Sequence, residues 1–269
     1  MGTVWGRPVM SSPPPPDPAT GPKLSALITV HNEEAQLGEC LDTLRFADEI
    51  VVVLDKCTDG SKEIAADYTT HLFEGSWEIE GERRNYGIGH CSGEWILEVD
   101  ADERVPEALA REIRETIKDA AGGYFLIPFD NYIGKRLVRF GWGAYWGVSA
   151  TVRLFSKGAK SWGGQRIHPS LELTGTRGRL ETPMIHYVDR NISDMIARLD
   201  RYSTARARDL RDQGDIGSFS ANLRRIFSRF FKCFIIRKGY REGIYGFLIA
   251  LFAGLYPIVS YLKARIEEE

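Results

Sequence analysis

Strand-like and helix-like segments alternate along the N-terminal half of this chain, and this alternation constrains the fold more than any other feature. Short apolar, β-prone runs lie at residues 24–30, 49–54, 69–73 and 94–99. Segments with helical spacing or helix-starting turns lie between them, at residues 33–45, 62–67 and 83–91. Strands that alternate with helices predict a parallel sheet covered on both faces. We therefore expect an α/β fold.

The fourth run leads directly into two carboxylates, Asp100 and Asp102. If the extended conformation persists to the end of the strand, both side chains point the same way. The pair would then lie beyond the carboxyl ends of the strands, where open α/β sheets bind ligands. Hard oxygen ligands of this kind suit Mg²⁺ or Mn²⁺. The alternative is a solvated acidic turn before a helix, because Asp favours N-caps and Pro106 suits a first helical turn.

The C-terminal region has a different character. Residues 193–211 have the pattern of a charged amphipathic helix, and residues 224–241 interleave arginine and lysine with bulky apolar side chains. Such mixing is typical of membrane-surface binding. Residues 243–262 then carry no formal charge over 20 residues, a length that nominally spans a bilayer. We expect an interfacial, monotopic helix pair first, a true span second and an oligomer interface third.

Composition limits the partners and the domain organisation. The net charge of −2 gives no global basic field, so we expect no nucleic-acid partner. The four cysteines show no metal-type pairing, which suits a reduced, cytosolic setting. Residues 1–22 contain a proline run and no apolar signal region, so they read as a disordered tail. The remainder divides into a catalytic domain, residues 23–192, and a helical, membrane-associating region, residues 193–269.

Several motifs resemble a known enzyme family in their order and spacing. They are T-V-H-N-E-E at Thr29–Glu34, V-V-L-D at Val52–Asp55, R-R-N at Arg83–Asn85, L-E-V-D-A-D-E at Leu97–Glu103, G-W-G-A-Y-W at Gly141–Trp146, V-R-L-F at Val152–Phe155, I-H-P-S-L-E-L at Ile167–Leu173 and R-Y-S-T at Arg201–Thr204. Together they resemble a family 2 glycosyltransferase with a GT-A fold, which is Rossmann-like with a mostly parallel sheet. The later motifs are similar to the bacterial subgroup that adds sugars to the lipopolysaccharide inner core.

The resemblance implies a nucleotide-sugar site at the strand ends. The positions that it assigns to donor binding are Thr29, Asn32, Glu33, Asp55, Arg84, Asn85 and Asp100, and those that it assigns to the metal are Asp102 and Asp100. Asp55 would accept from the uracil N–H, which favours UDP, and Arg84 would give forked bonds to the diphosphate. Considered alone, Asp55 could equally close an Asx-turn, and Arg84 could be a solvated cation on a helix.

The catalytic base is less clearly marked. Enzymes of the subgroup often carry His-Glu where this chain has His168-Pro169, so the expected carboxylate is absent. Glu172 and His168 are the nearest substitutes, and Asp130 is a third. Glu172 also suits the exposed face of a strand, and His168 a structural role. Family 2 enzymes invert, so the base would deprotonate the acceptor on the face opposite the leaving group.

We therefore predict a membrane-associated, inverting glycosyltransferase that moves a sugar from a UDP-sugar to a lipopolysaccharide-core or other lipid-linked acceptor. It would act on the cytoplasmic face of the cytoplasmic membrane, with residues 224–262 attached to anionic lipid. One alternative is an enzyme that charges polyprenyl phosphate, whose acceptor needs no strong base. Another is a non-catalytic nucleotide-sugar-binding scaffold, against which the intact Asp100 and Asp102 speak.

Overall fold

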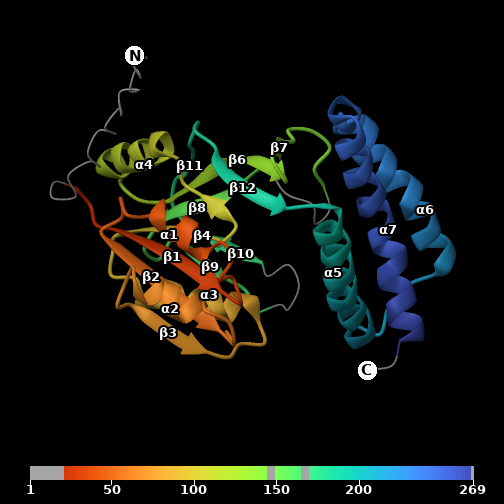
Figure 1. Ribbon diagram of the computed structural model, residues 1–269, viewed down its shortest axis with the longest axis horizontal. Coiled ribbons are helices and arrows are strands. Elements are labelled where there is room, and N and C mark those ends of the chain that lie inside the picture. Colours follow the sequence, from red (N-terminus) through yellow and green to blue (C-terminus); the bar gives the residue numbers. More distant parts are fainter. Residues whose placement is uncertain (1–20, 144–148, 165–169, 268–269) are drawn as a thin grey trace, which may run out of the picture.

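The structure is a computed structural model that describes residues 21–143, 149–164 and 170–267. The strands are β1 (Leu24–Val30), β2 (Glu49–Asp55), β3 (Leu72–Gly75), β4 (Trp95–Val99), β5 (Glu103–Arg104), β6 (Tyr124–Ile133), β7 (Arg136–Leu137), β8 (Ala150–Ser156), β9 (Lys160–Trp162), β10 (Leu171–Leu173), β11 (Arg177–Arg179) and β12 (Met184–Asp189). The helices are α1 (Leu37–Asp42), α2 (Ser61–Ala66), α3 (Glu80–His90), α4 (Glu107–Asp119), α5 (Ile192–Asp212), α6 (Phe219–Phe231), η2 (Lys232–Ile236), η3 (Gly239–Glu242) and α7 (Ile244–Ile266). The sheet forms one side of the molecule, and α5, α6 and α7 stand together at the other (Figure 1).

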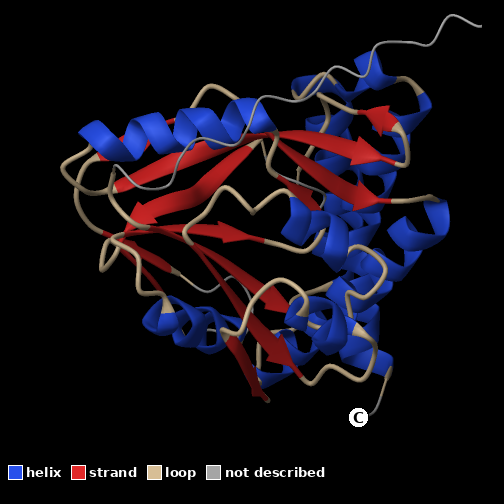
Figure 2. Cartoon of the chain, turned by 60° about the vertical axis from the view of Figure 1, so that its left-hand side comes forward, coloured by secondary structure: helices blue, strands red, loops and turns tan. Residues whose placement is uncertain are grey.

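The strands form a mixed sheet in the order β3-β2-β1-β4-β8-β6-β12-β5, with β7 and β11 also paired to β6. β1 pairs in parallel with β2 and β4, and β2 pairs in parallel with β3, as the βα alternation predicts. Beyond β4 the sheet departs from that pattern, because β8 inserts antiparallel between β4 and β6. Helices lie on both faces of this sheet (Figure 2).

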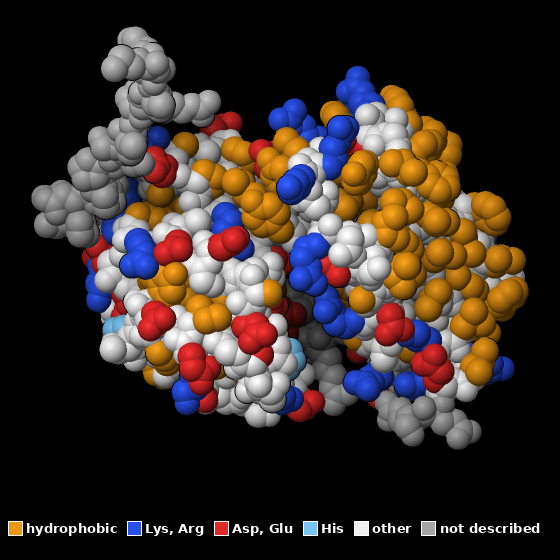
Figure 3. Space-filling model, in the orientation of Figure 1, with side chains coloured by type: hydrophobic (Ala, Val, Ile, Leu, Met, Phe, Trp, Pro, Cys, Tyr) orange, Lys and Arg blue, Asp and Glu red, His pale blue; other side chains and the backbone are white. Residues whose placement is uncertain are grey.

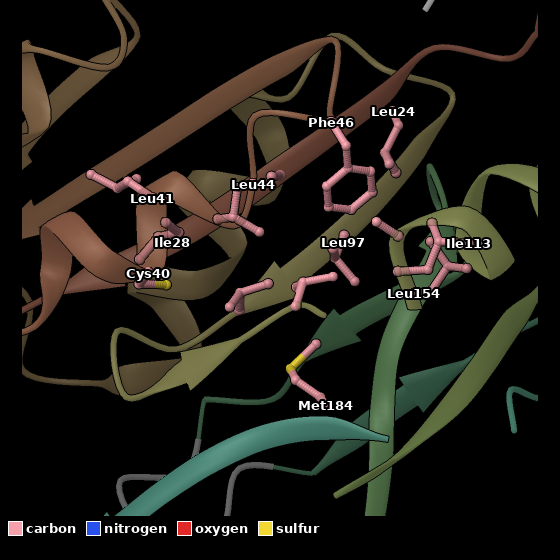
Figure 4. Packing of buried hydrophobic residues seen from close by; sticks show 14 of the residues in the cluster. Leu24, Ile28, Cys40, Leu41, Leu44, Phe46, Leu97, Ile113, Leu154 and Met184 are labelled. Carbon is pink, nitrogen blue, oxygen red and sulfur yellow. The ribbon is translucent and has the colours of Figure 1, made fainter. Parts of the chain in front are cut away.

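Side chains of β1 alternate between two cores, one on each face of the sheet. Leu24, Ala26 and Ile28 pack with α1 and α4 residues in the larger core, whereas Leu27 packs with residues of β2, β4 and α3 in the other. Figure 4 shows Ile28 beside Cys40 and Leu41 of α1, and Leu24 near Phe46. Removal of each fully buried leucine or isoleucine side chain from water contributes roughly 1.5–3 kcal/mol to the stability of the fold. Burial on both faces explains why β1 is a continuous apolar run rather than an alternating one.

Several predicted elements have different bounds in the structure; α3, for example, begins at Glu80 rather than at Arg83. The helix predicted for residues 33–45 is confined to Leu37–Asp42, because backbone turns such as Gln36 N to Glu33 O occupy its beginning. The third strand begins at Leu72 rather than at Thr69. The Thr69 hydroxyl donates to the Ile50 carbonyl oxygen and accepts from the His71 backbone N–H, which holds a turn in place of the first strand residues.

The C-terminal helices pack closely on one another and on the sheet. Asn191 caps α5 by accepting from the Asp194 N–H, and Ser218 caps α6 by accepting from the Ala221 N–H. α7 lies against both α5 and α6. A Cβ at Gly254 would lie only 2.8 Å from the Ile226 carbonyl oxygen, so glycine is needed for the close approach of α6 and α7.

One apolar cluster joins the helices to the sheet. α7 contributes Ile249, Phe252 and Tyr256, and α5 contributes Met195 and Leu199. The sheet side contributes Ile133 of β6, Val188 of β12, and Val138 and Trp142 from the loop after β7. The helices are therefore built into the same core as the end of the sheet.

Candidate active site

The carboxyl ends of β1, β2 and β4 bring the predicted donor-binding residues to one edge of the sheet. Thr29 and Asp55 are buried there, and Asn32 follows β1 in the left-handed backbone region, with φ of 56°. The Asn32 side-chain oxygen accepts from the Thr58 N–H at 2.7 Å, which ties the loop after β1 to the loop after β2. This convergence agrees with the location expected for a ligand crevice.

A cavity of about 400 Å³ opens beside this edge. The loop after β1 and Asp102 form one part of its lining, and the end of β12 and the first turns of α5 form the other. The residues concerned are Asn32, Glu33, Ala35, Gln36, Asp102, Tyr187, Val188, Asp189, Arg190, Asp194, Ala197, Arg198 and Arg201. In Figure 3 a hollow separates the sheet from the helices, with basic side chains along the helical border. Carboxylates and guanidinium groups therefore face the same space.

Asp100 and Asp102 have different partners, because the extended conformation on which the sequence prediction depended does not persist beyond Val99. β4 ends at Val99, and the chain then turns, with the Glu103 N–H bonded to the Asp100 carbonyl oxygen at 2.9 Å. The strand alternation therefore stops before the second carboxylate. Asp100 enters a group of buried charges, whereas Asp102 lines the cavity.

Asp100 is held by two arginines. Its Oδ1 accepts from Arg84 at 3.0 Å, and its Oδ2 pairs with Arg153, which also pairs with Glu103. Burial disfavours the charge of Asp100, but Arg153 and Arg84 outweigh burial and hold its pKa well below the usual range. The carboxylate is ionised, and both of its oxygens are engaged by protein groups. The role predicted for Asp100 in ribose or metal binding remains a prediction.

Glu98 forms the second centre of this buried group. It is 1% exposed, pairs with Arg84, and accepts from Lys160 at 2.7 Å. Burial alone would raise the pKa of Glu98, but Lys160 and Arg84 lower it to about 2. The charged cluster consists of Arg84, Glu98, Asp100, Glu103, Arg153 and Lys160. Two of its members, Asp100 and Glu103, close the turn that carries Asp102.

His186 of β12 joins Asp102 in a second arrangement that the sequence did not reveal. Its Nε2 lies 3.4 Å from Asp102 Oδ2, and its Nδ1 lies 2.8 Å from the Asn131 side-chain oxygen. Burial lowers the basicity of the ring, but the hydrogen bond with Asp102 outweighs it and raises the pKa of His186. With Nδ1 donating to Asn131, Nε2 is left directed at Asp102.

These side chains fit a divalent cation. Ligand atoms of Asp102, Glu103 and His186 all lie within 4.8 Å of one another. Carboxylate oxygen and imidazole nitrogen are both ligands of Mn²⁺, and a partner such as Asn131 on the second ring nitrogen orients a metal-binding histidine. Glu103 is buried against Arg153, so Asp102 and His186 are the more accessible members.

The remaining donor-site residues occupy distinct positions. Asp55 Oδ1 accepts from the Trp77 N–H at 3.1 Å, and its Oδ2 pairs with Arg83 at 3.0 Å. Arg84 is directed into the charged cluster, so Arg83 is the member of the pair that faces Asp55. The Asn85 amide donates to the Trp162 carbonyl oxygen and accepts from the Trp162 N–H, which ties α3 to β9. No observation tests the nucleotide contacts of these residues, which stay predictions.

Two of the three candidate bases, Glu172 and Asp130, do not line the cavity. His168 is outside the described residues. Glu172 is exposed in β10 and accepts from the Ser161 hydroxyl at 3.1 Å. Asp130 neighbours Asn131 on β6, so its side chain points to the opposite face from the amide that contacts His186. Neither is among the described residues that line the cavity, whereas Asp189 is, with its pKa raised by burial.

Comparison with known proteins identifies the class of enzyme. The model of glycosyl transferase family 2 matches residues 25–163, more than half of the 269 residues. The chain therefore belongs to glycosyl transferase family 2, and its mixed sheet with flanking helices is a GT-A fold. The resemblance noted in the sequence is confirmed.

One curated relative is similar along most of the chain, and two solved structures are similar over less than half of it. The lipopolysaccharide core biosynthesis glycosyltransferase LpsC of Rhizobium meliloti is 26% identical over 89% of this chain and 91% of that protein. A solved structure of S. aureus TarS with UDP-GlcNAc is 23% identical over 45% of this chain and 38% of that one, with a TM-score of 0.38. Glucosyl-3-phosphoglycerate synthase from Mycobacterium tuberculosis, with Mn²⁺ and UDP-glucose, is 18% identical over 42% and 44%, with a TM-score of 0.35.

Proposed function

We propose that this family 2 glycosyltransferase transfers a sugar, with inversion, from a UDP-sugar to a lipopolysaccharide-core or similar lipid-linked acceptor. The observation that carries the proposal is the cavity at the strand ends, which joins Asp102 to the arginines of α5. The similarity to LpsC over nearly the full length of both chains supports the class of acceptor.

The roles proposed for the cavity residues follow from where charge develops on the sugar donor during transfer. When the bond between the sugar and the diphosphate breaks, the leaving group gains negative charge and the anomeric carbon becomes cationic. Arg201 lines the cavity and can donate forked hydrogen bonds to phosphate oxygens, whereas Arg190, which also lines it, is paired with Asp194 at 2.8 Å. Mg²⁺ or Mn²⁺ held by Asp102 and His186 would add positive charge at the same place. Arg198 is already paired with Asp189 at 2.9 Å.

The base must accept a proton from the acceptor hydroxyl on the side away from the diphosphate. His168, Glu172 and Asp130 remain proposed from the motif order. Asp189 joins them because it lines the cavity and because burial, against the opposing effect of Arg198, raises its pKa and so makes it a stronger base.

The role of Asp55 gives a prediction on nucleotide choice. A carboxylate offers about four lone-pair sites, so Asp55 can accept from uracil while it stays bonded to Trp77 and Arg83. We expect UDP to bind more tightly than GDP or CDP, and Asp55→Ala to lose about 1.5–3 kcal/mol of that preference. Calorimetric titration measures it, with Asp67→Ala on the exposed end of α2 as the control. Tighter binding of GDP than of UDP to the unaltered protein would favour the polyprenyl-phosphate alternative.

We also propose that the helical region rests on the membrane surface. An apolar patch covers α6, η2, η3 and the start of α7, and consists of Phe219, Leu223, Phe227, Phe231, Ile235, Ile236, Tyr240, Ile244 and Phe247. Phe219, Leu223, Phe227 and Phe231 recur at every fourth position, so they share one face of α6. Figure 3 shows hydrophobic side chains gathered over this part of the molecule. An exposed apolar surface bordered by arginine and lysine is typical of interfacial binding to anionic lipid.

The packing of α7 favours an interfacial helix over a span. α7 is the helix among the described residues that is long and apolar enough to cross a bilayer, yet 56% of its apolar window is buried inside the molecule. Crossing the bilayer as a separate helix would break the apolar cluster that α7 shares with α5 and the sheet. Its outer face can enter the lipid surface without that loss.

Vesicle flotation tests this membrane contact. Each phenylalanine removed from water contributes roughly 1.5–3 kcal/mol, so Phe227→Gln with Phe231→Gln should lower binding to anionic vesicles at least roughly tenfold. Salt should weaken binding of the unaltered protein only in part, because the apolar contact remains. The control is Tyr86→Gln with Leu171→Gln, two exposed residues on the sheet side. Equal flotation of the two double variants would show that the apolar patch is not the contact.

A further inference from the structure

A second cavity lies between the C-terminal helices, apart from the active-site cavity, and arginines surround it. Its volume is about 200 Å³. The lining residues are Arg206 and Leu210 of α5, Ile216, Asn222, Arg225 and Arg229 on or before α6, and Tyr256, Pro257 and Ser260 of α7. The two cavities share no lining residue. We propose that this cavity binds a phosphate group.

The positive charge at this cavity is poorly compensated. Arg225 and Arg229 are one helical turn apart on α6, a spacing at which like charges repel. Within the described parts of the chain, neither forms an ion pair with a carboxylate. Arg206 has Asp209 beside it at 3.7 Å, so among the described residues one ion pair with a carboxylate serves the three guanidinium groups. A bound anion would relieve this repulsion.

The cavity also fixes the direction of its donors. Asn222 is 4% exposed, and its Oδ1 accepts from Arg225 Nη1 at 2.9 Å. Its Nδ2 donates to the Ser218 carbonyl oxygen at 3.0 Å, which sets the orientation of the amide. Arg229 lies over the Tyr256 ring at 5.9 Å. Arginines held by neighbours lose less side-chain entropy when they bind an anion.

Phosphate suits this site in shape and in size. Guanidinium groups match phosphate oxygens with forked, charge-assisted hydrogen bonds. A cavity of about 200 Å³ is several times the roughly 30 Å³ that one water occupies in the liquid, so it can hold a phosphate group with some of its waters. Leu210 and Pro257 give it apolar walls, and charge interactions are stronger beside apolar groups than in bulk water.

The phosphate could be free or belong to a lipid headgroup, and two measurements on the full-length protein distinguish these sources. The first is calorimetric titration with inorganic phosphate at constant ionic strength, with chloride as the reference. The second is flotation with phosphatidylcholine vesicles, with and without phosphatidic acid. The test variant is Arg225→Gln with Arg229→Gln. The matched control is Arg208→Gln with Arg224→Gln, exposed arginines of the same helices that do not line the cavity.

We expect the test variant to lose at least tenfold in affinity for phosphate, or in its preference for phosphatidic acid, while the control keeps both. Loss in the titration identifies a free phosphate, and loss in flotation alone identifies a lipid headgroup. If the test variant does not fold, Arg225→Lys with Arg229→Lys is used instead. It keeps the charge but should still weaken phosphate binding, because lysine cannot form the paired hydrogen bonds that a guanidinium group gives to phosphate oxygens. Equal behaviour of test and control variants in both measurements, or no response of the unaltered protein to phosphate or phosphatidic acid, would overturn the proposal.

Discussion

Replacement of Asp102 by asparagine should lower transfer activity by roughly 10²-fold or more, which corresponds to about 2.7 kcal/mol of transition-state stabilisation. The amide oxygen binds a divalent cation less strongly than a carboxylate and leaves His186 without its charged partner. The side chain is 27% exposed at the cavity, so the fold should persist. Release of UDP from a donor measures the activity, and the electron paramagnetic resonance of bound Mn²⁺ measures the metal site separately.

Asp119→Asn provides the matched control, because Asp119 is exposed at the end of α4, away from the cavity. It should leave both activity and Mn²⁺ binding unchanged. If Asp102→Asn turns over at the normal rate, and EDTA has no effect on the unaltered protein, Asp102 does not act through a metal.

Replacement of Glu98 by alanine should produce the largest loss of stability. It leaves Arg84 and Lys160 buried without their shared partner, and breaking a buried ion pair in this way costs about 3–5 kcal/mol. For a chain of this size, the thermal midpoint should fall by roughly 6–20 °C. Glu82→Ala on the exposed side of α3 should change stability by less than about 0.5 kcal/mol. Similar midpoints for the two variants would show that the charged cluster contributes little.

Glu98 also predicts how the stability of the folded protein changes as the pH is lowered. The pKa of Glu98 is lowered from its ordinary 4.5 to about 2 in the folded protein. The folded state therefore binds this proton less readily than the unfolded state, and stability falls as acid is added. The contribution of Glu98 should be fully present above about pH 4.5 and lost as the pH falls towards 2. Thermal midpoints of the unaltered protein and of Glu98→Ala should converge over that interval.

Local patterns were sufficient to predict the first half of the fold. β1, β2 and β4 are apolar runs buried on both faces, and such runs are typical of strands in a parallel sheet. The long helix α5 follows the predicted residues 193–211 within one residue at each end, because its apolar face repeats regularly and Asn191 caps it. These features depend on neighbours in the sequence.

The candidate site was predictable only in part, because its geometry depends on contacts between distant segments. Asp102 could be named from its position after β4, but its contact with His186 requires the pairing of β12 with β5, which no local pattern encodes. The engagement of Asp100 likewise involves Arg153, which lies on the inserted strand β8. One signal was available: Glu98 and Arg153 are charges inside otherwise apolar strands, which indicates buried partners.

The apolar cluster shared by α5, α7 and the sheet has a practical consequence for attempts to make the protein more soluble by shortening the chain. A polypeptide that ends before α6 would leave Met195 and Leu199 exposed, together with the side chains of Ile133 and Trp142 that α7 covers. Such a product should aggregate rather than yield a detached catalytic unit. Polar substitutions confined to the outward-facing phenylalanines of α6 spare this cluster, so they are the sounder route to a detergent-free preparation.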